Sequence, residues 1–230
     1  MNLAEIVAVF RYESDDEVAP YKISNTRAIE FANDAENQAC RRARLLRDAS
    51  TEDVCIYTVD ADDETVPLHA SVLFVRRAIV DGESRPLLRK FMADMDAERP
   101  GWETEVGPPI AFIPDFESGK LRLYPIPEEG LTLNLQVIRL PLAPMVDIAY
   151  AVGPPEVLID IPEIPARLHR ELVYWMLHRL YSKKDSANET RDDKLADDYE
   201  RRFAAVFGPA SSAIDETWIS ERHDPEDGVF

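Results

Sequence analysis

The step between apolar residues changes twice along the chain, and this change limits the folds that the chain can adopt. Between residues 25 and 47 the apolar residues recur every three or four positions, which is the spacing of one helix face. From residue 52 to residue 141 they mostly recur at every second position, which predicts strands. The helical step returns after Pro165. Because the outer helices must bury their apolar faces, they are expected to pack on each other, with the strands inserted between them.

The individual elements follow from this pattern and from the turn residues. A short helix is predicted over residues 3–11, and a long helix begins at Asn25 or Thr26, either of which can cap it. Another short helix is predicted over residues 87–97, and two helices follow Pro165. Two strands are predicted at residues 54–59 and 71–80. Three more, at residues 110–114, 121–124 and 131–139, are joined by short turns and are expected to form an antiparallel meander.

The chain is therefore expected to have an α+β fold. Its N- and C-terminal helices form a helical bundle, with an inserted antiparallel β domain and an extended C-terminal arm. The arm is acidic and has few large apolar groups, so it cannot form a core of its own. The predicted domains are residues 1–50 and 160–208 (helical bundle), 51–142 (inserted antiparallel β domain), 143–159 (Pro-rich connector) and 209–230 (extended C-terminal arm).

The chain is strongly acidic, with 44 Asp and Glu against 26 Lys and Arg and a net charge of −18. Affinity for nucleic-acid phosphate comes from Lys and Arg, so general DNA binding is not expected, and an anionic membrane is disfavoured for the same reason. Neither a transmembrane helix nor a signal peptide is expected, because the required apolar runs are missing. Cys40 and Cys55 form no disulfide framework and are expected to be buried thiols.

The common motifs of catalytic and metal sites are missing from the sequence. The run from Asp60 to Glu64 suggests calcium, but Thr65 and Ser71 stand where a calcium loop needs Gly and Glu. His169 and His178 are nine residues apart on one helix and are expected on a polar face or at an interface. We therefore expect no catalytic residue, no cofactor and no metal. A catalytic carboxylate pair stays open as an alternative, since acids are abundant and none is singled out.

Several segments, taken in order, resemble the head–tail connector (portal adaptor) proteins of tailed bacteriophages. They are the helix from Phe31 to Leu46, Gly101-Trp102, Gly107-Pro108-Pro109, the hairpin ending in Leu121–Pro127, the strand from Leu131 to Pro141, and paired helices holding Leu172–Met176 and Asp192–Phe203. Together they span about residues 25–208. One departure is Lys22, which stands where the family pattern leads us to expect a tryptophan before the first long helix.

The resemblance implies a non-catalytic structural protein of the virion. Such proteins form a ring, usually a dodecamer, that docks on the portal protein and continues the DNA channel to the tail tube or nozzle proteins. DNA would only pass through the lumen, and an acidic lumen would let it slide without sticking. The expected location is the head–tail junction of the virion, after assembly in the host cytoplasm.

The C-terminal arm is the predicted partner-binding segment. Trp218, Ile219 and Phe230 are its large apolar groups after Ile214, and we expect them to contact a neighbouring copy or the portal. A solvated tail without a partner is the alternative for this segment. Two alternatives remain for the whole chain: a tail-completion or assembly protein without portal contact, and a soluble enzyme with an unrecognised site.

Overall fold

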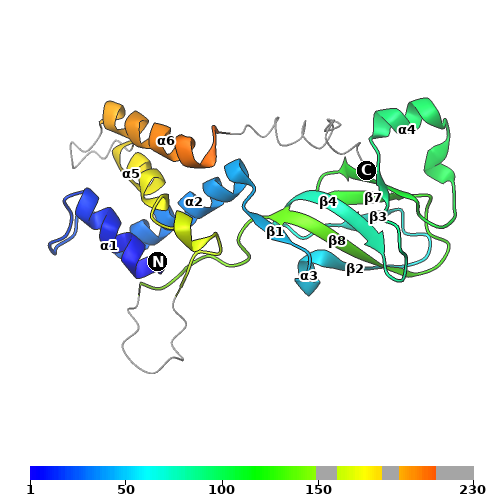
Figure 1. Cartoon of the computed structure of the whole chain (residues 1–230), viewed down its shortest axis with the longest axis horizontal. Helices are drawn as coiled ribbons and strands as arrows, with labels where there is room; N and C mark the ends of the chain where they lie inside the picture. The colour runs from blue at the N-terminus through cyan, green and yellow to red at the C-terminus, as the bar shows by residue number, and fades with distance from the viewer. Residues whose placement is uncertain (149–159, 183–191, 211–230) are drawn as a thin grey trace, which may run out of the picture. The chain divides into compact units, whose positions relative to one another are not determined.

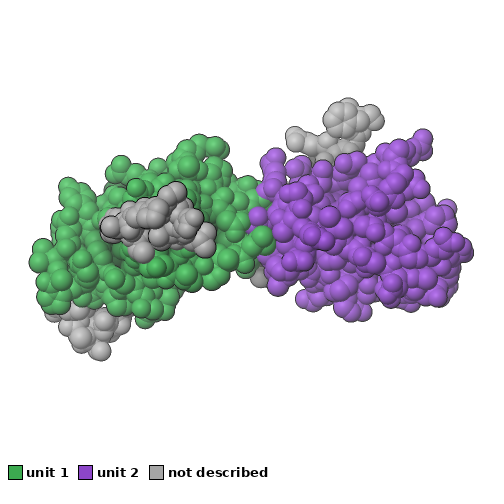
Figure 2. Space-filling view, turned by 90° about the horizontal axis from the view of Figure 1, so that it is seen from below, with its two compact units in different colours: residues 1–46, 140–210 green, residues 47–139, 211–230 purple. Residues whose placement is uncertain are grey.

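A computed structural model describes residues 1–148, 160–182 and 192–210 (Figure 1). Within these ranges the chain forms two compact units, drawn in separate colours in Figure 2. The helical unit comprises residues 1–46 and 140–210, and the described part of the β unit comprises residues 47–139. The predicted α+β class, with strands inserted between N- and C-terminal helices, is confirmed. Residues 211–230 of the predicted arm lie outside the described residues.

Side-chain oxygens cap the first turns of α1 (Leu3–Glu13), α2 (Asn25–Ala43) and α6 (Asp193–Phe207) in the helical unit. Asn2 and Glu5 cap each other's backbone N–H groups in a capping box at the first helix. Ser24 caps the long helix in place of the predicted Asn25 or Thr26, because its hydroxyl accepts the N–H of Arg27, three residues on. The unit also holds the 3-10 helix η2 (Ala166–Leu168) and α5 (Leu172–Ser182).

Helix α2 packs against α1, α5 and α6 (Figure 1). The alanines that revealed its apolar face, Ala28, Ala32, Ala35 and Ala39, are fully buried. Small side chains let the neighbouring helices approach closely, and larger residues such as Phe10, Met176 and Phe203 fill the space around them. The helical unit thus has a core of its own.

One sheet of the β unit is built around β8 (Leu131–Arg139), with which β1 (Leu46–Asp48), β2 (Ile56–Val59) and β4 (Val72–Val80) all pair. The pairs with β2 and β4 are antiparallel. Leu133, Leu135 and Val137 of β8 are buried, which is the step of two that predicted this strand.

A second sheet has the order β3 (Thr65–Pro67), β7 (Lys120–Tyr124), β6 (Ala111–Glu117) and β5 (Leu88–Arg89). β6 and β7 form an antiparallel hairpin, whereas β5 joins β6 in parallel. Phe112, Leu121 and Leu123 of this sheet share a core with Leu133 and Leu135 of β8, so the two sheets bury each other's apolar faces.

The predicted meander is wrong at its third strand, because β8 does not continue the sheet of β6 and β7. The chain after β7 instead pairs with residues 105–107: the N–H of Ile126 donates to Glu105, and that of Gly107 donates to Ile126. Pro125 and Pro127 flank this point and have no N–H to extend the ladder. The chain therefore leaves the hairpin and enters the other sheet.

Two predicted element boundaries are also corrected. The predicted strand 54–59 begins only at Ile56, because a short helix, α3 (Glu52–Cys55), precedes it. The predicted helix 87–97 is strand β5 followed by α4 (Met92–Glu98), with the 3-10 helix η1 (Trp102–Thr104) after it. The N–H groups of Leu88 and Lys90 donate to Ile110 and Phe112, at 2.9 and 3.0 Å, which holds this stretch extended.

Candidate assembly surfaces

Within residues 1–148, 160–182 and 192–210, no group of three or more His, Cys, Asp or Glu side chains is placed to hold a metal ion. No helix in the same ranges is long and apolar enough to cross a membrane. Cys40 and Cys55 are free and buried, as predicted from the sequence. Burial, with the nearby Asp48 charge, raises the pKa of the Cys55 thiol, which keeps it in its unreactive protonated form.

His169 was expected on one helix with His178, on a polar face or at an interface; it lies instead before α5, and its side chain is buried. Its Nε2 lies 2.8 Å from the carbonyl oxygen of Ile164, and its Nδ1 lies 2.7 Å from that of Met1. From the turn between η2 and α5, the imidazole thus joins the N-terminal residue Met1 to the backbone at Ile164, just before η2, and its buried ring nitrogens both have polar partners. His178 is half-buried, with its Nδ1 3.0 Å from the carbonyl oxygen of Ala196. Both histidines therefore have structural roles.

A buried ion pair fixes the loop between α1 and α2. The Nη1 of Arg11 lies 2.7 Å from Asp16, and both side chains are less than a tenth exposed. Arg11 also donates to the carbonyl of Ile23 at 3.0 Å and to Asn25 at 2.8 Å. Asp16 in turn accepts the N–H groups of Lys22 and Ile23. Lys22, the departure from the family pattern, therefore joins this network through its backbone.

The fixed loop exposes apolar side chains. Val18 at its tip is 82% exposed, and Tyr12 and Tyr21 are 68% and 44% exposed. The ring of Tyr21 covers the Arg11 guanidinium, whose carbon lies 3.7 Å from the ring centre. The bonds of Arg11 and Asp16 fix the backbone on either side of Val18, which lowers the entropy that the loop loses when a partner covers it. We call residues 12–21 the loop surface of the helical unit.

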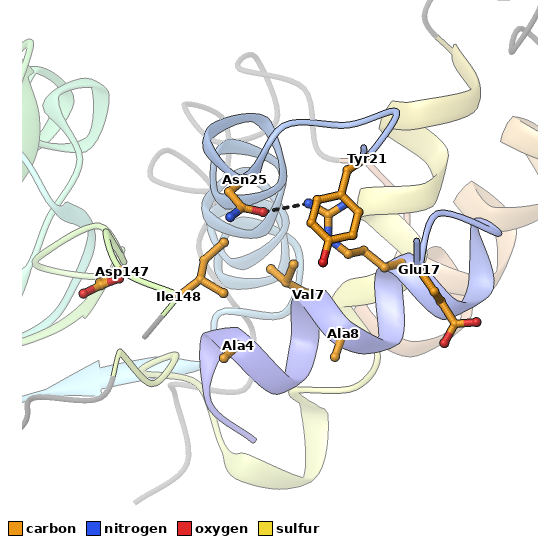
Figure 3. A pocket seen from close by; sticks show the side chains of 9 residues that line it. Ala4, Val7, Ala8, Glu17, Tyr21, Asn25, Asp147 and Ile148 are labelled. Atoms are coloured by element: carbon orange, nitrogen blue, oxygen red, sulfur yellow. Dashed lines mark hydrogen bonds between the residues drawn. The ribbon is translucent and has the colours of Figure 1, made fainter. Parts of the chain in front are cut away.

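A hollow of about 490 Å³ adjoins the loop surface (Figure 3). Ala4 and Ala8 of α1 form part of its wall, and Tyr21, Asn25 and Ile148 surround it. Its buried charge, Arg11, is already neutralised by Asp16. Glu17 and Asp147 also line the hollow. With small side chains along part of its wall, the hollow has room for a side chain of a protein partner.

Polar residues of α2 bind the backbone at Met145, in the Pro-rich connector (residues 143–159), and at residues 163–164, after it. Asn33 exchanges two hydrogen bonds of 2.8 Å with the backbone of Met145. The buried carboxylate of Glu36 accepts the N–H groups of Glu163 and Ile164, at 2.5 and 3.3 Å. Burial raises the pKa of Glu36 to about 7, although the two N–H donors partly oppose the shift. The segment that follows the connector is thus anchored by a carboxyl that titrates near neutral pH.

Replacing Glu36 with glutamine is expected to remove part of the pH dependence of stability. The pKa of Glu36 is raised in the folded state, so its stabilising contribution is complete below its unfolded pKa and is lost as the pH rises through about 7. The loss in the wild type is expected to be about 2–3 kcal/mol between pH 5 and 8. Urea unfolding at several pH values measures this loss of stability. Glu30→Gln, a change of an exposed residue on the same helix, is the control. Parallel curves for wild type and Glu36→Gln would contradict this expectation.

The β unit carries a second apolar surface, a groove of about 460 Å³ beside its edge strand β5. Leu88 and Ile110 stand on the groove and are 61% and 52% exposed. Val80, Leu87 and Pro108 also line it, together with Arg85 and Glu83. We call this the β groove.

The structure does not bring the predicted partner-binding residues into view, because Trp218, Ile219 and Phe230 lie outside the described ranges. Sequence reasoning missed the loop surface and the β groove. The acids that follow Arg11, from Glu13 to Glu17, were a signal for the loop surface, because a lone arginine before several acids predicts an ion pair. Leu88 gave no signal, because its spacing to Phe91 and Met95 fits a buried helix face.

Comparison with known proteins identifies the family of the chain. No curated protein matches the sequence. A family model described as SU10 adaptor protein matches residues 1–222, nearly the whole chain. The match confirms the adaptor resemblance seen in the sequence. The chain therefore belongs to the SU10 adaptor protein family and is a phage adaptor protein.

Proposed function

We propose that the chain is a head–tail connector subunit: it forms a ring, docks on the portal protein and continues the DNA channel toward the tail tube or nozzle proteins. Membership of an adaptor family places it among structural proteins that contact other virion proteins. A twelvefold ring is the symmetry that the family resemblance suggests. The proposed location is the head–tail junction, and the proposed role is not catalytic.

The observation that supports a ring most directly is the pair of unlike apolar surfaces, one on each unit. The loop surface lies on the helical unit and the β groove on the β unit. When a subunit uses two different surfaces for contact with its neighbours, the contacts run head to tail, and they close into a ring if the rotation permits. A symmetric dimer would instead use one self-complementary surface.

The charge of the β unit supports passage of DNA without binding. The turn Asp60–Glu64 lies beside the turn Pro127–Gly130, since the N–H of Asp62 donates to the carbonyl of Pro127 at 2.9 Å. Asp60, Asp62, Asp63, Glu128 and Glu129 of these turns are exposed. An acidic surface repels phosphate, so we propose that this end of the β unit faces the channel, where DNA slides past it.

The proposal is tested by mixing two versions of the chain with the portal of its own phage: the full chain and a chain truncated after Gly208. The full chain is expected to bind the portal stoichiometrically. The truncated chain should keep its fold, because all residues in the described core clusters precede Gly208, but it should not join the portal. The reason is loss of the proposed anchors Trp218, Ile219 and Phe230. Co-sedimentation with the portal measures the binding of the full and of the truncated chain, and circular dichroism checks that the truncated chain is folded.

The outcomes separate the two parts of the proposal. Normal binding by a folded, truncated chain would show that the arm is not needed and would leave the ring intact. A full chain that ignores the portal would contradict the connector function itself. The assembly protein without portal contact, or an enzyme, would then become the better account.

A further inference from the structure

The β groove is built as a binding surface. Leu88 lies on β5, the last strand of its sheet, and Ile110 stands just before β6, to which β5 is paired. Hydrogen bonds hold both sides: the N–H of Leu87 donates to Ala78 and that of Leu88 donates to Ile110, at 2.8 and 2.9 Å. The groove is therefore pre-formed, and its two most exposed side chains are aliphatic. Such a surface favours an apolar anchor on the partner.

One exposed arginine lines the groove, and two more lie on the strand that is hydrogen-bonded to it. Arg85 lines it, and Arg76 and Arg77 directly precede Ala78, whose carbonyl binds Leu87. Arg76, Arg77 and Arg85 are all exposed, and none has an ion-pair partner in the described part of the chain. This is unusual in a chain in which acids outnumber bases by 18. Glu83 also lines the groove, so Arg85 is the one positive group among the lining residues.

We propose that the β groove binds the acidic C-terminal segment, residues 211–230, of a neighbouring copy. The segment carries six acids and one arginine, and it places Trp218 and Ile219 between acidic residues. Apolar anchors flanked by acids complement an apolar groove that Arg85 lines, with Arg76 and Arg77 exposed on the adjoining strand. An extended segment of this length spans about 65 Å, enough to reach a neighbour. The inference rests on the proposed function, since it requires copies side by side, and it names the surface that receives the arm.

Disulfide trapping between two full-length variants tests the proposal. Chains with Leu88→Cys are mixed with chains carrying Ile219→Cys, assembled on the portal and oxidised with copper phenanthroline. Because each chain carries one introduced cysteine and Cys40 and Cys55 are buried, a bond between positions 88 and 219 can form only between copies. Mass spectrometry identifies the linked peptides, and light scattering on the same sample reports assembly.

Matched controls separate the groove from a random encounter. Ile56→Cys replaces Leu88→Cys in the first control, since Ile56 is an exposed apolar residue of the same unit outside the groove. The 88–219 product is expected to exceed the 56–219 product at least fivefold. Adding Arg85→Glu to the Leu88→Cys chain should lower the yield severalfold. Arg47→Glu, an exposed change away from the groove, should leave the yield unchanged.

Each outcome decides between the two proposals. Assembled rings without an 88–219 product above the control would overturn the groove assignment and leave the connector function standing. A strong product from chains that ignore the portal would support the groove and overturn the connector. If neither the 88–219 product nor assembly on the portal is observed, the groove assignment and the connector function are both overturned. Loss of the product when duplex DNA is added, with DNA retained on the rings, would assign the arginines to phosphate and overturn the peptide assignment.

Discussion

Replacing Arg11 with alanine is expected to lower the free energy of unfolding of the helical unit by about 3–5 kcal/mol. The guanidinium joins Asp16, Ile23 and Asn25 in a buried network. Its removal leaves the Asp16 carboxylate buried without its counter-charge, and a buried unpaired charge is among the most costly defects in a protein. The loop surface is expected to lose its fixed conformation as well.

Urea unfolding followed by circular dichroism measures this loss, and hydrogen exchange locates it. Exchange should accelerate in α1 and α2, whereas β8, which belongs to the core of the other unit, should keep its protection. Arg27→Ala is the control, because Arg27 pairs with Glu30 on an exposed helix surface and should cost less than about 1 kcal/mol. Equal losses for the two variants would show that the buried network contributes no more than an exposed pair.

Replacing Asp48 with alanine is expected to destabilise the β unit by about 3 kcal/mol. Asp48 and Arg139 stand where the chain enters and leaves this unit, and their side chains pair at 2.6 Å with little exposure. The same carboxylate accepts the N–H groups of Ser50 and Thr51 and the Thr51 hydroxyl, which sets the turn into α3. The substitution removes the ion pair and this turn together.

The acid stability of the β unit should depend on the same residue. Burial opposes ionisation of Asp48, but the donors from Ser50, Arg139 and Thr51 outweigh it and hold its pKa well below the usual range. A depressed pKa gives stability that is present above the ordinary value of about 4 and is lost as the pH falls through the folded value. The wild type should therefore lose more stability on acidification than Asp48→Ala. Asp53→Ala, an exposed change on α3, is the control, and identical acid curves for Asp48→Ala and wild type would contradict this role.

The order of helices and strands was predictable because it depends on local spacing. Alanine steps of three and four defined α2, and the alternating Leu133, Leu135 and Val137 of β8 are the buried residues that predicted this strand. The path of the chain between strands was not predictable in the same way. Whether β8 continues the hairpin of β6 and β7 depends on the backbone bonds that Ile126 and Gly107 form, and these join residues far apart in the sequence.

The candidate surfaces depended even more on long-range contacts. The β groove exists because residues 87–88 meet Ala78 on one side and Ile110 on the other, and no local pattern records this. Glu36 resembles any polar residue on a helix until the segment that follows the connector buries it. The predicted anchors Trp218, Ile219 and Phe230 came from composition alone, and they remain a prediction.

The mass of the complex with the portal tests the central claim most directly. Light scattering on the chain alone should give a monomer of 26.1 kDa. After mixing with the portal of its own phage, the portal mass should rise by a fixed, whole number of chains that matches one copy for each portal subunit. A portal whose mass stays unchanged at saturating chain would contradict the connector ring.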